Sequence, residues 1–319
     1  MRYCVYGLTL FSPDFPLEKL PPAPADIGPE VHLRLGAAPP SLSCTDDRLV
    51  YRSFAADGSL FARLYRWPDC ALLKMEMEGD FFFDLQKKEI AVAPRSGRLD
   101  RAKVALLGPV LACWLTLHGR FPLHASAVVD PEGGGHVFIA HAGSGKSSLA
   151  AAALKKGGKL LTDDILAFDP DGESVMGYPG YPQMKFWPDA FQVFFPGETQ
   201  DPLLPEIPKL CTDKTESFWN QPAPLRALYL LENRPDAPSV ALSLIQGHDA
   251  VFQLLNHSFI SHHLNPRELA SQLELYSNLA RRVPVFRLSY PRRWNQLGKV
   301  VEAIFSSKIP AGRTDASDR

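Results

Sequence analysis

Apolar residues recur in short segments over roughly the first 100 residues, and prolines, glycines and aspartates separate these segments. The segments are rich in aromatic and β-branched side chains, which is typical of strands. They span residues 3–11, 31–35, 49–54, 60–67, 71–77, 81–85 and 89–93. We therefore expect residues 1–100 to form a small, mostly antiparallel β domain with a structural or substrate-docking role.

A different pattern begins near Lys103. A mostly apolar stretch predicts a helix that continues to His118 and ends at Gly119. A strand, a glycine-rich loop, a helix and another strand then follow, in the order that a nucleotide-binding α/β core requires. The predicted strands are residues 123–129, 136–140 and 159–168, and the predicted helix is residues 148–156.

The last third of the chain contains one proline-rich segment, residues 195–224, which we expect to be loop-like. Asn265, Pro266 and Glu268 are the cap, first-turn and capping-box residues typical of a helix start. Leu269, Leu273, Tyr276 and Ala280 fall on one face of that helix, which we expect to be buried. Strands at residues 226–232 and 285–290, a helix at 294–305 and a disordered tail after Lys308 complete the prediction.

Composition and charge exclude several classes of protein. Lysine plus arginine (34) nearly equals aspartate plus glutamate (35), so no net field draws the chain to nucleic acid or to an anionic membrane. The five scattered cysteines form no C-x-x-C pair, which suits a reducing cytoplasm. The longest apolar run, residues 104–117, is shorter than the roughly 20 residues of a membrane span and predicts a buried helix. The N-terminus lacks the features of a signal peptide.

The glycine-rich loop reads AHAGSGKS from Ala140 to Ser147. It matches the phosphate-loop pattern G-x-x-x-x-G-K-[ST] except at Ala140, where the pattern has glycine. Backbone N–H groups of residues His141, Ala142, Gly143, Ser144, Gly145, Lys146, Ser147 and Ser148 would surround the nucleotide phosphates. Lys146 would reach the β- and γ-phosphates, and the Ser147 hydroxyl would bind Mg²⁺.

Two adjacent carboxylates, Asp163 and Asp164, follow the next apolar strand. Burying such a pair without a partner is costly, and a magnesium-nucleotide site supplies the partner. One carboxylate can hold the metal while the other accepts the proton of an attacking hydroxyl. A pair of capping or turn aspartates is the alternative.

Other residues are weaker candidates. His124 opens the strand beside the loop and is a candidate to shape the acceptor pocket, or it is a structural histidine. Lys185, Arg226, Arg281 and Arg282 are candidates to neutralise developing charge, although surface roles are as common. The histidines His257, His262 and His263 are clustered, but no matching ligands support a metal site.

The segments LHASAVV, AHAGSGKSSLA and LLTDDIL together resemble the catalytic domain of HPr kinase/phosphorylase, a bacterial serine kinase family related in fold to phosphoenolpyruvate carboxykinase. In that family a histidine, a phosphate loop and an aspartate pair occur in this order. The resemblance implies that His124 and Lys146 are catalytic with Asp163 as the base, and that Asp164 lies near magnesium. It extends over about residues 118–305 and is most specific at the motifs.

The resemblance has two departures. The family's glycine-rich signature EI-x-G-L-G-I-x-N is absent, and GYPGYPQMKFWPD occupies its place, so the phosphorylase reaction is not carried over. The N-terminal third also differs from that family's own N-terminal domain. The layout looks closer to the HPr-kinase-like proteins of lasso-peptide clusters, some of which phosphorylate the C-terminal serine of a precursor peptide.

These observations together predict an α/β protein. A P-loop, HPr-kinase-like domain (residues 101–308) would follow the smaller β domain (residues 1–100), with a tail at residues 309–319. The expected function is transfer of the ATP γ-phosphate, with Mg²⁺, to a serine of a peptide or small protein in the cytoplasm. A small-metabolite kinase and a nucleotide-binding scaffold that recruits a peptide are the alternatives. The sequence does not identify the phosphate acceptor or the oligomeric state. A homo-oligomer is compatible with it.

Overall fold

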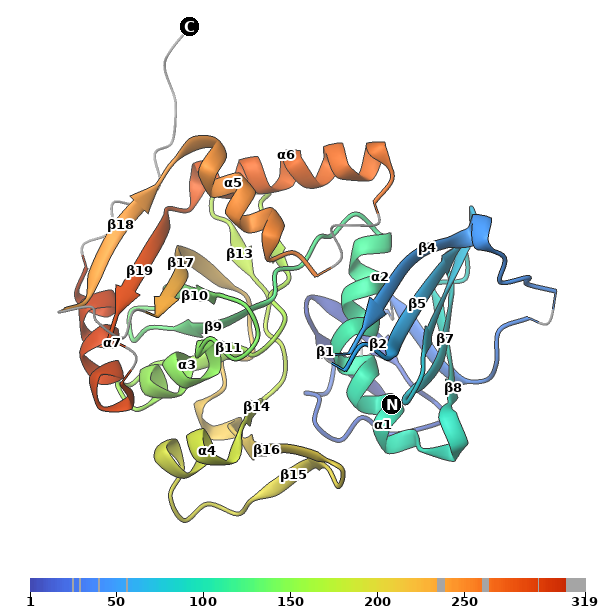
Figure 1. Ribbon diagram of the computed structural model, residues 1–319, viewed down its shortest axis with the longest axis horizontal. Coiled ribbons are helices and arrows are strands. Elements are labelled where there is room, and N and C mark those ends of the chain that lie inside the picture. The colour runs from blue at the N-terminus through green and yellow to red at the C-terminus, as the bar shows by residue number, and fades with distance from the viewer. Residues whose placement is uncertain are drawn as a thin grey trace, which may run out of the picture. The chain divides into compact units, whose positions relative to one another are not determined.

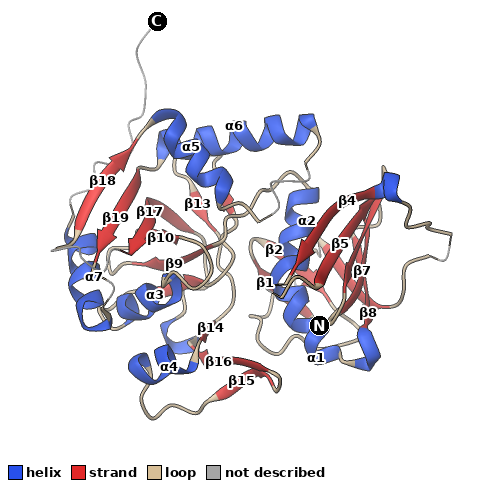
Figure 2. Cartoon of the chain, viewed as in Figure 1, coloured by secondary structure: helices blue, strands red, loops and turns tan. Residues whose placement is uncertain are grey.

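The computed structural model describes residues 1–24, 26–28, 30–39, 41–55, 57–233, 239–259, 264–291 and 293–307. The predicted disordered tail and residues His262 and His263 lie outside these ranges. The chain divides into two compact units, of which the first is Met1–His118 and the second begins at Gly119. Each unit is built on its own sheet (Figures 1 and 2).

The described residues of the first unit form an eight-stranded sheet in the order β1-β2-β3-β8-β7-β6-β5-β4. The strands are β1 (Arg2–Val5), β2 (Leu8–Phe11), β3 (Val31–Leu35), β4 (Leu49–Phe54), β5 (Leu60–Arg66), β6 (Cys70–Met75), β7 (Gly79–Asp84) and β8 (Glu89–Pro94), with 3₁₀ turns η1 (Asp46–Arg48) and η2 (Arg95–Gly97). Strand β3 pairs in parallel with β2 and β8, whereas the other neighbours are antiparallel. The mostly antiparallel β character predicted from the sequence is confirmed.

One predicted strand, residues 3–11, is in fact the hairpin of β1 and β2. Its turn residues Tyr6 and Gly7 have positive φ angles of 56° and 71°. The alternating pattern continues through the turn because Tyr6 is itself buried and donates its hydroxyl to the Leu107 carbonyl at 3.0 Å. Hydrophobic alternation alone therefore could not reveal the break.

The predicted helix near residues 103–118 begins earlier and is irregular. It consists of α1 (Leu99–Ala105), a wider π turn η3 (Leu106–Val110) and α2 (Leu111–Leu117). Pro109 lies inside the π turn, where proline removes a helical hydrogen bond. The helix is buried as expected, with Trp114 stacked on Phe83 at 6.3 Å between ring centroids. Its contacts group it with the first unit, whereas the predicted boundary lies before it.

The second unit contains a mixed sheet with a central parallel set. The strands are β9 (Ala125–Val129), β10 (Gly135–Ile139), β11 (Lys159–Thr162), β12 (Phe168–Asp169), β13 (Met176–Gly177), β17 (Ala223–Asn233), β18 (Ala241–Ile245) and β19 (Val285–Tyr290). Strands β10, β17 and β19 are parallel, and β9 runs antiparallel between β10 and β11. The carboxyl ends of β10, β11 and β19 therefore share an edge with the amino end of β9.

Helices cover this sheet on both sides (Figure 1). They are α3 (Lys146–Leu154), α5 (Gly247–Asn256), α6 (Pro266–Arg282) and α7 (Leu297–Ser306), which the 3₁₀ turn η5 (Trp294–Gln296) precedes. A further helix, α4 (Pro188–Phe194), packs against α3. Figure 1 shows α3 and α7 together on one side and α5 and α6 on the other. Leu149 of α3, Phe191 of α4 and Val300 of α7 share one hydrophobic core with strand residues Phe138 and Tyr229.

The segment 195–224, expected to be loop-like, contains two strands, so that prediction was wrong. Strands β15 (Asp201–Leu204) and β16 (Ile207–Asp213) form a small sheet with β14 (Gln183–Phe186), and the 3₁₀ turn η4 (Thr215–Ser217) follows. Pro202 is tolerated because β15 is an edge strand. Pro208 lies beyond the part of β16 that pairs with β14, which begins at Leu210.

Helix α6 forms as predicted and Tyr276 is buried as expected, but the two leucines of the predicted core face are not buried. Leu269 and Leu273 are 41% and 39% exposed, so the expectation that they are core was wrong. The buried residues are Gln272, Tyr276 and Leu279. Gln272 occupies a core position because its side-chain amide donates to the Ser258 hydroxyl at 2.7 Å. Helical spacing correctly predicts that the two leucines share a face of the helix, but it cannot predict whether another element covers that face.

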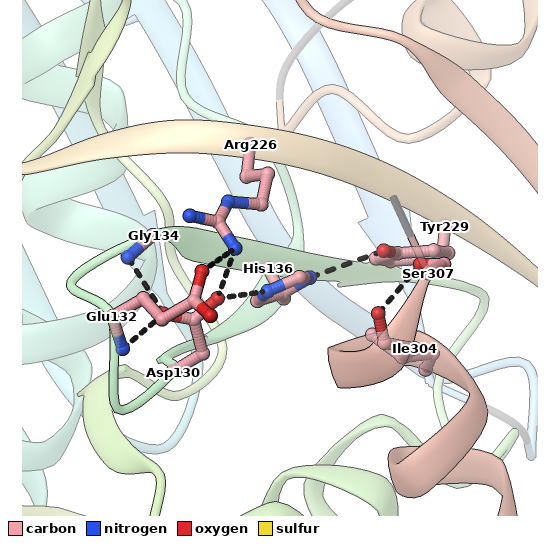
Figure 3. A network of polar contacts seen from close by, with 8 residues as sticks. All are labelled: Asp130, Glu132, Gly134, His136, Arg226, Tyr229, Ile304 and Ser307. Carbon is pink, nitrogen blue, oxygen red and sulfur yellow. Dashed lines mark hydrogen bonds and ion pairs between the residues drawn. The ribbon is translucent and has the colours of Figure 1, made fainter. Parts of the chain in front are cut away.

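A buried polar cluster fixes the turn between β9 and β10, at the edge away from the carboxyl end of β10 (Figure 3). Asp130 accepts the backbone N–H groups of Glu132 and Gly134 and an Arg226 N–H at 2.9 Å. Its other neighbour is the His136 imidazole, whose Nε2 lies 2.9 Å from Oδ2 and whose Nδ1 lies 3.1 Å from the Tyr229 hydroxyl. An Nε2–H tautomer satisfies both contacts, so Asp130 joins β9, β10 and β17 at this edge.

Within the described part of the chain, every helix is too short or too polar to cross a membrane.

Candidate functional site

The glycine-rich loop connects the end of β10 to the start of α3, as the sequence predicts. Gly143 and Gly145 have φ angles of 78° and 94°, which only glycine adopts readily. Ala140, where the common pattern has glycine, is not among the described residues with positive φ. Alanine at this position therefore costs the loop no backbone strain.

Lys146 begins α3 and folds back over the loop. Its ammonium donates to the Ala140 carbonyl at 2.8 Å and to the His141 carbonyl at 3.4 Å, and the residue is only 5% exposed. Burial lowers the pKa of Lys146, while the carboxylates Asp164 and Asp163 oppose that shift. A phosphate group at the loop could take over the hydrogen bonds that these carbonyls now accept.

Asp163 lies directly after β11 and contacts the loop. Its carboxylate accepts hydrogen bonds from the hydroxyls of Ser126, at 2.5 Å, and Ser147, at 2.9 and 3.2 Å. The Lys185 backbone N–H also donates to it at 3.3 Å. Burial, and then the charge of Asp164, raises the pKa of Asp163. The phosphate loop and the aspartate pair are therefore in contact, as predicted, through the hydrogen bonds of the Ser147 hydroxyl to Asp163.

Asp164 has a different environment from its neighbour. Its φ of 75° is rare for a residue with a side chain and turns its carboxylate away from the Asp163 contacts. Asp164 accepts a hydrogen bond from the Lys185 ammonium at 3.1 Å. Burial would raise the pKa of Asp164, but Lys185 and then His124 lower it to about 2. The two aspartates therefore differ in both access and proton affinity.

His124 lies beside the aspartates because it immediately precedes β9. Its backbone N–H donates to the His257 carbonyl at 2.8 Å, and its ring meets the Phe259 ring edge at 5.3 Å. Burial, followed by the charge of Lys146, lowers the pKa of His124 to about 4. The imidazole is therefore neutral near pH 7.

A cavity of about 210 Å³ joins these groups. The loop residues Ala142, Gly143, Gly145, Lys146, Ser147 and Ser148 line it with His124, Asp164 and Lys185. His141 and Ser144 instead line a neighbouring cavity with His257, Gln253 and Arg287. Of the predicted loop residues, six face the first cavity and these two face the second.

Several further residues line the first cavity that sequence reasoning did not select. They are Phe186, Trp187, Asp189, Ala190, Lys209, Tyr290, Arg293, Trp294 and Leu297. Lys209 was missed because its segment was predicted to be a loop. Ser126 was missed although strand alternation puts it on the same face as His124. With Lys146 and Lys185, Lys209 makes three lysines around one cavity, which suits a polyanionic ligand.

The Ser147 and Asp163 oxygens fit a magnesium ion. A hydroxyl and a carboxylate already lie within 3.2 Å of each other, and hard oxygen donors of this kind are the ligands that Mg²⁺ prefers. These two side chains would hold the ion, which would neutralise phosphate charge when bound.

The other charged candidates have structural partners. Arg226 belongs to the polar cluster at the opposite edge of the sheet, where it also contacts Glu132 at 2.9 Å. Arg282 donates to the carbonyls of Pro170 and Gly172. Neither arginine lines the loop cavity, so neither supports the predicted clamp. The His257 and His141 rings lie close together but tilted by 47°, with 4.7 Å between ring centroids.

No protein-family model and no curated protein matches the chain. A solved structure of the Hpr(Ser) kinase/phosphatase from Coxiella burnetii is similar at 13% identity with a TM-score of 0.31. The match covers 57% of this chain and 92% of that one.

Proposed function

We propose that this protein is an ATP-dependent phosphotransferase that transfers the γ-phosphate to a serine hydroxyl of a peptide or small protein. The observation that carries the proposal is the contact of Ser147 in the phosphate loop with Asp163, at 2.9 Å, beside an Asp164–Lys185 ion pair in the same cavity. Phosphoryl transfer needs a phosphate cradle, metal ligands and a proton acceptor together, and these residues have the chemistry that would supply all three.

In this proposal the loop amides and Lys146 bind the β- and γ-phosphates. The serine oxygen attacks the γ-phosphorus while the bond from that phosphorus to the β-phosphate oxygen breaks, so ADP leaves and a phosphoserine forms. The hydroxyl proton passes to a carboxylate. Lys185 would neutralise charge that develops on the transferring group.

The division of roles between the aspartates is open to test. The sequence assigned the proton to Asp163 and the metal to Asp164, and the raised pKa of Asp163 suits a proton acceptor. Access argues for the reverse, because Asp163 is engaged by Ser126 and Ser147 whereas Asp164 lines the cavity. Access to the reacting group counts before pKa when a general base is chosen. We therefore favour Asp164 as the proton acceptor, with Asp163 and Ser147 as the metal ligands.

The acceptor is proposed from the motif resemblance and is tested directly. The protein is incubated with Mg-ATP and serine peptides, including peptides ending in serine, and products are read by mass spectrometry. We expect a phosphate adduct on serine. Phosphorylation of small hydroxylated metabolites alone would support a metabolite kinase. ATP binding without transfer to any acceptor would support a nucleotide-binding scaffold.

A further inference from the structure

Two tryptophans line the wall of the loop cavity and are largely exposed. Trp187 is 49% exposed and Trp294 is 45% exposed, although both border the cavity that contains the phosphate loop. Large aromatic side chains on a cavity wall offer flat apolar surface that a ligand can cover. The proposed phosphate contacts leave these two indoles unused.

The tryptophans flank the helix that follows the phosphate loop. Trp187 immediately precedes α4, and Trp294 begins η5 before α7. Helices α4 and α7 both share the hydrophobic core with α3, through Phe191 and Val300 packed with Leu149. The two indoles therefore lie beside two helices that pack with α3, and both line the cavity together with the loop residue Lys146.

The orientation of a bound triphosphate follows from the loop. Its γ-phosphate end would lie toward Asp164 and Lys185, which belong to the same cavity. The nucleoside would then extend from the α-phosphate along the remaining wall of the cavity, which Trp187, Tyr290, Trp294 and Leu297 line. A nucleoside attached to the α-phosphate would therefore contact an aromatic surface.

Charge around the indoles also suits a nucleotide. The Lys209 ammonium lies 5.7 Å from the centre of the Trp187 ring, and Arg293 lines the cavity beside Trp294. A cation held against one indole and a second cation on the same cavity wall match a ligand with a flat ring at one end and negative charge at the other.

We propose that Trp187 and Trp294 form the nucleobase subsite of this protein, stacking on the base of the nucleoside triphosphate whose phosphates the loop binds. This inference rests on the proposed function. Stacking recognises the face of a base and not its edge, so both purines should bind.

The test separates base binding from phosphate binding. Calorimetry measures the affinities of Mg-ATP, Mg-GTP and Mg-tripolyphosphate for the wild type, Trp187→Ala, Trp294→Ala and the control Phe252→Ala. Phe252 is exposed on α5 and lines none of the cavity. We expect each tryptophan variant to lose about tenfold or more in ATP and GTP affinity, which is the scale of base stacking on an aromatic ring. Tripolyphosphate affinity should stay unchanged, which also shows that the variants fold, and Phe252→Ala should behave as wild type.

Three results with the variants would overturn the subsite, and two results with the wild type would do so as well. The three variant results are unchanged ATP affinity in both variants, equal losses for ATP and tripolyphosphate, and a loss confined to the KM for an acceptor peptide. If the wild type binds tripolyphosphate as tightly as it binds ATP, the base adds no affinity. That result also overturns the subsite, although it leaves the phosphate site intact. A wild type that binds neither ligand overturns the proposed function and the subsite together.

Discussion

Lys146 is the residue whose removal isolates phosphate binding. Lys146→Ala leaves the loop glycines in place but deletes the cation expected at the β- and γ-phosphates, so we expect about a 100-fold loss of transfer. The control Lys156→Ala removes a surface lysine that pairs with Glu302 at 2.5 Å and should have no effect. Steady-state transfer rates check this, and wild-type activity in Lys146→Ala would exclude the loop as the phosphate site.

The aspartate pair gives a second test at this scale. We expect Asp164→Asn to keep ATP binding and lose transfer, because the carboxylate that faces the cavity can no longer accept a proton. We expect Asp163→Asn to weaken Mg-ATP binding, because it loses the charge beside Ser147. Calorimetry and transfer rates on both variants decide between the assignments. The opposite pattern would restore the roles predicted from the sequence.

His124 gives a pH dependence whose sign is fixed by its pKa. The native pKa of about 4 lies below the ordinary 6.5, so the unfolded chain binds the proton more tightly. The contribution of His124 to stability is complete above pH 6.5 and is lost as the pH falls toward 4. Urea unfolding midpoints should fall over this interval, and less in His124→Gln. An equal fall in both proteins would show that the histidine is not buried as described.

The sequence predicted which residues come together better than it predicted their surroundings. Their catalytic roles stay predictions, but the convergence of the loop, the aspartate pair and His124 could be predicted because each belongs to a local motif. The positive φ of Asp164 and the engagement of Asp163 by Ser126 could not, because they depend on backbone geometry and on a strand contact between distant residues.

At the scale of elements, the polar cluster around Asp130 holds the β9–β10 turn against β17. Asp130→Ala leaves His136 buried without its partner, so we expect the free energy of unfolding to fall by about 2–3 kcal/mol. The control Glu132→Ala removes a side chain that is 74% exposed and should change stability little. Urea denaturation measures both. Because the cluster lies at the far end of β10, ATP affinity should persist in Asp130→Ala under native conditions.

Secondary-structure elements were predictable where the hydrophobic pattern and the residues that begin or end an element agreed. Strands β3 and β4 have the predicted bounds, and β9, the loop and α3 follow in the predicted order. The failures have physical causes. Prolines on the edge strand β15 and at the start of β16 disguised these two strands. Helical periodicity could not say which face of α6 would be covered. Both depend on partners that the local sequence does not contain.

At the scale of the whole molecule, the α/β class with a mostly β N-terminal unit was predictable from the change of pattern near residue 100. The convergence of β9, β10 and β11 on one edge was partly predictable, because a hairpin followed by a loop and helix returns the next strand to the same end. The contribution of β16 and η5 to the cavity was not, since these segments carry no motif. Lys185 of β14, in contrast, was a candidate from the sequence and does line the cavity.

The most direct measurement follows the labelled γ-phosphate. The protein is incubated with Mg²⁺, a serine peptide identified by mass spectrometry, and ATP labelled with ³²P at either the γ- or the α-position. We expect label on peptide serine from γ-labelled ATP only, and none with Lys146→Ala. Absence of label on every tested acceptor, despite measurable ATP binding, would contradict phosphoryl transfer at this site.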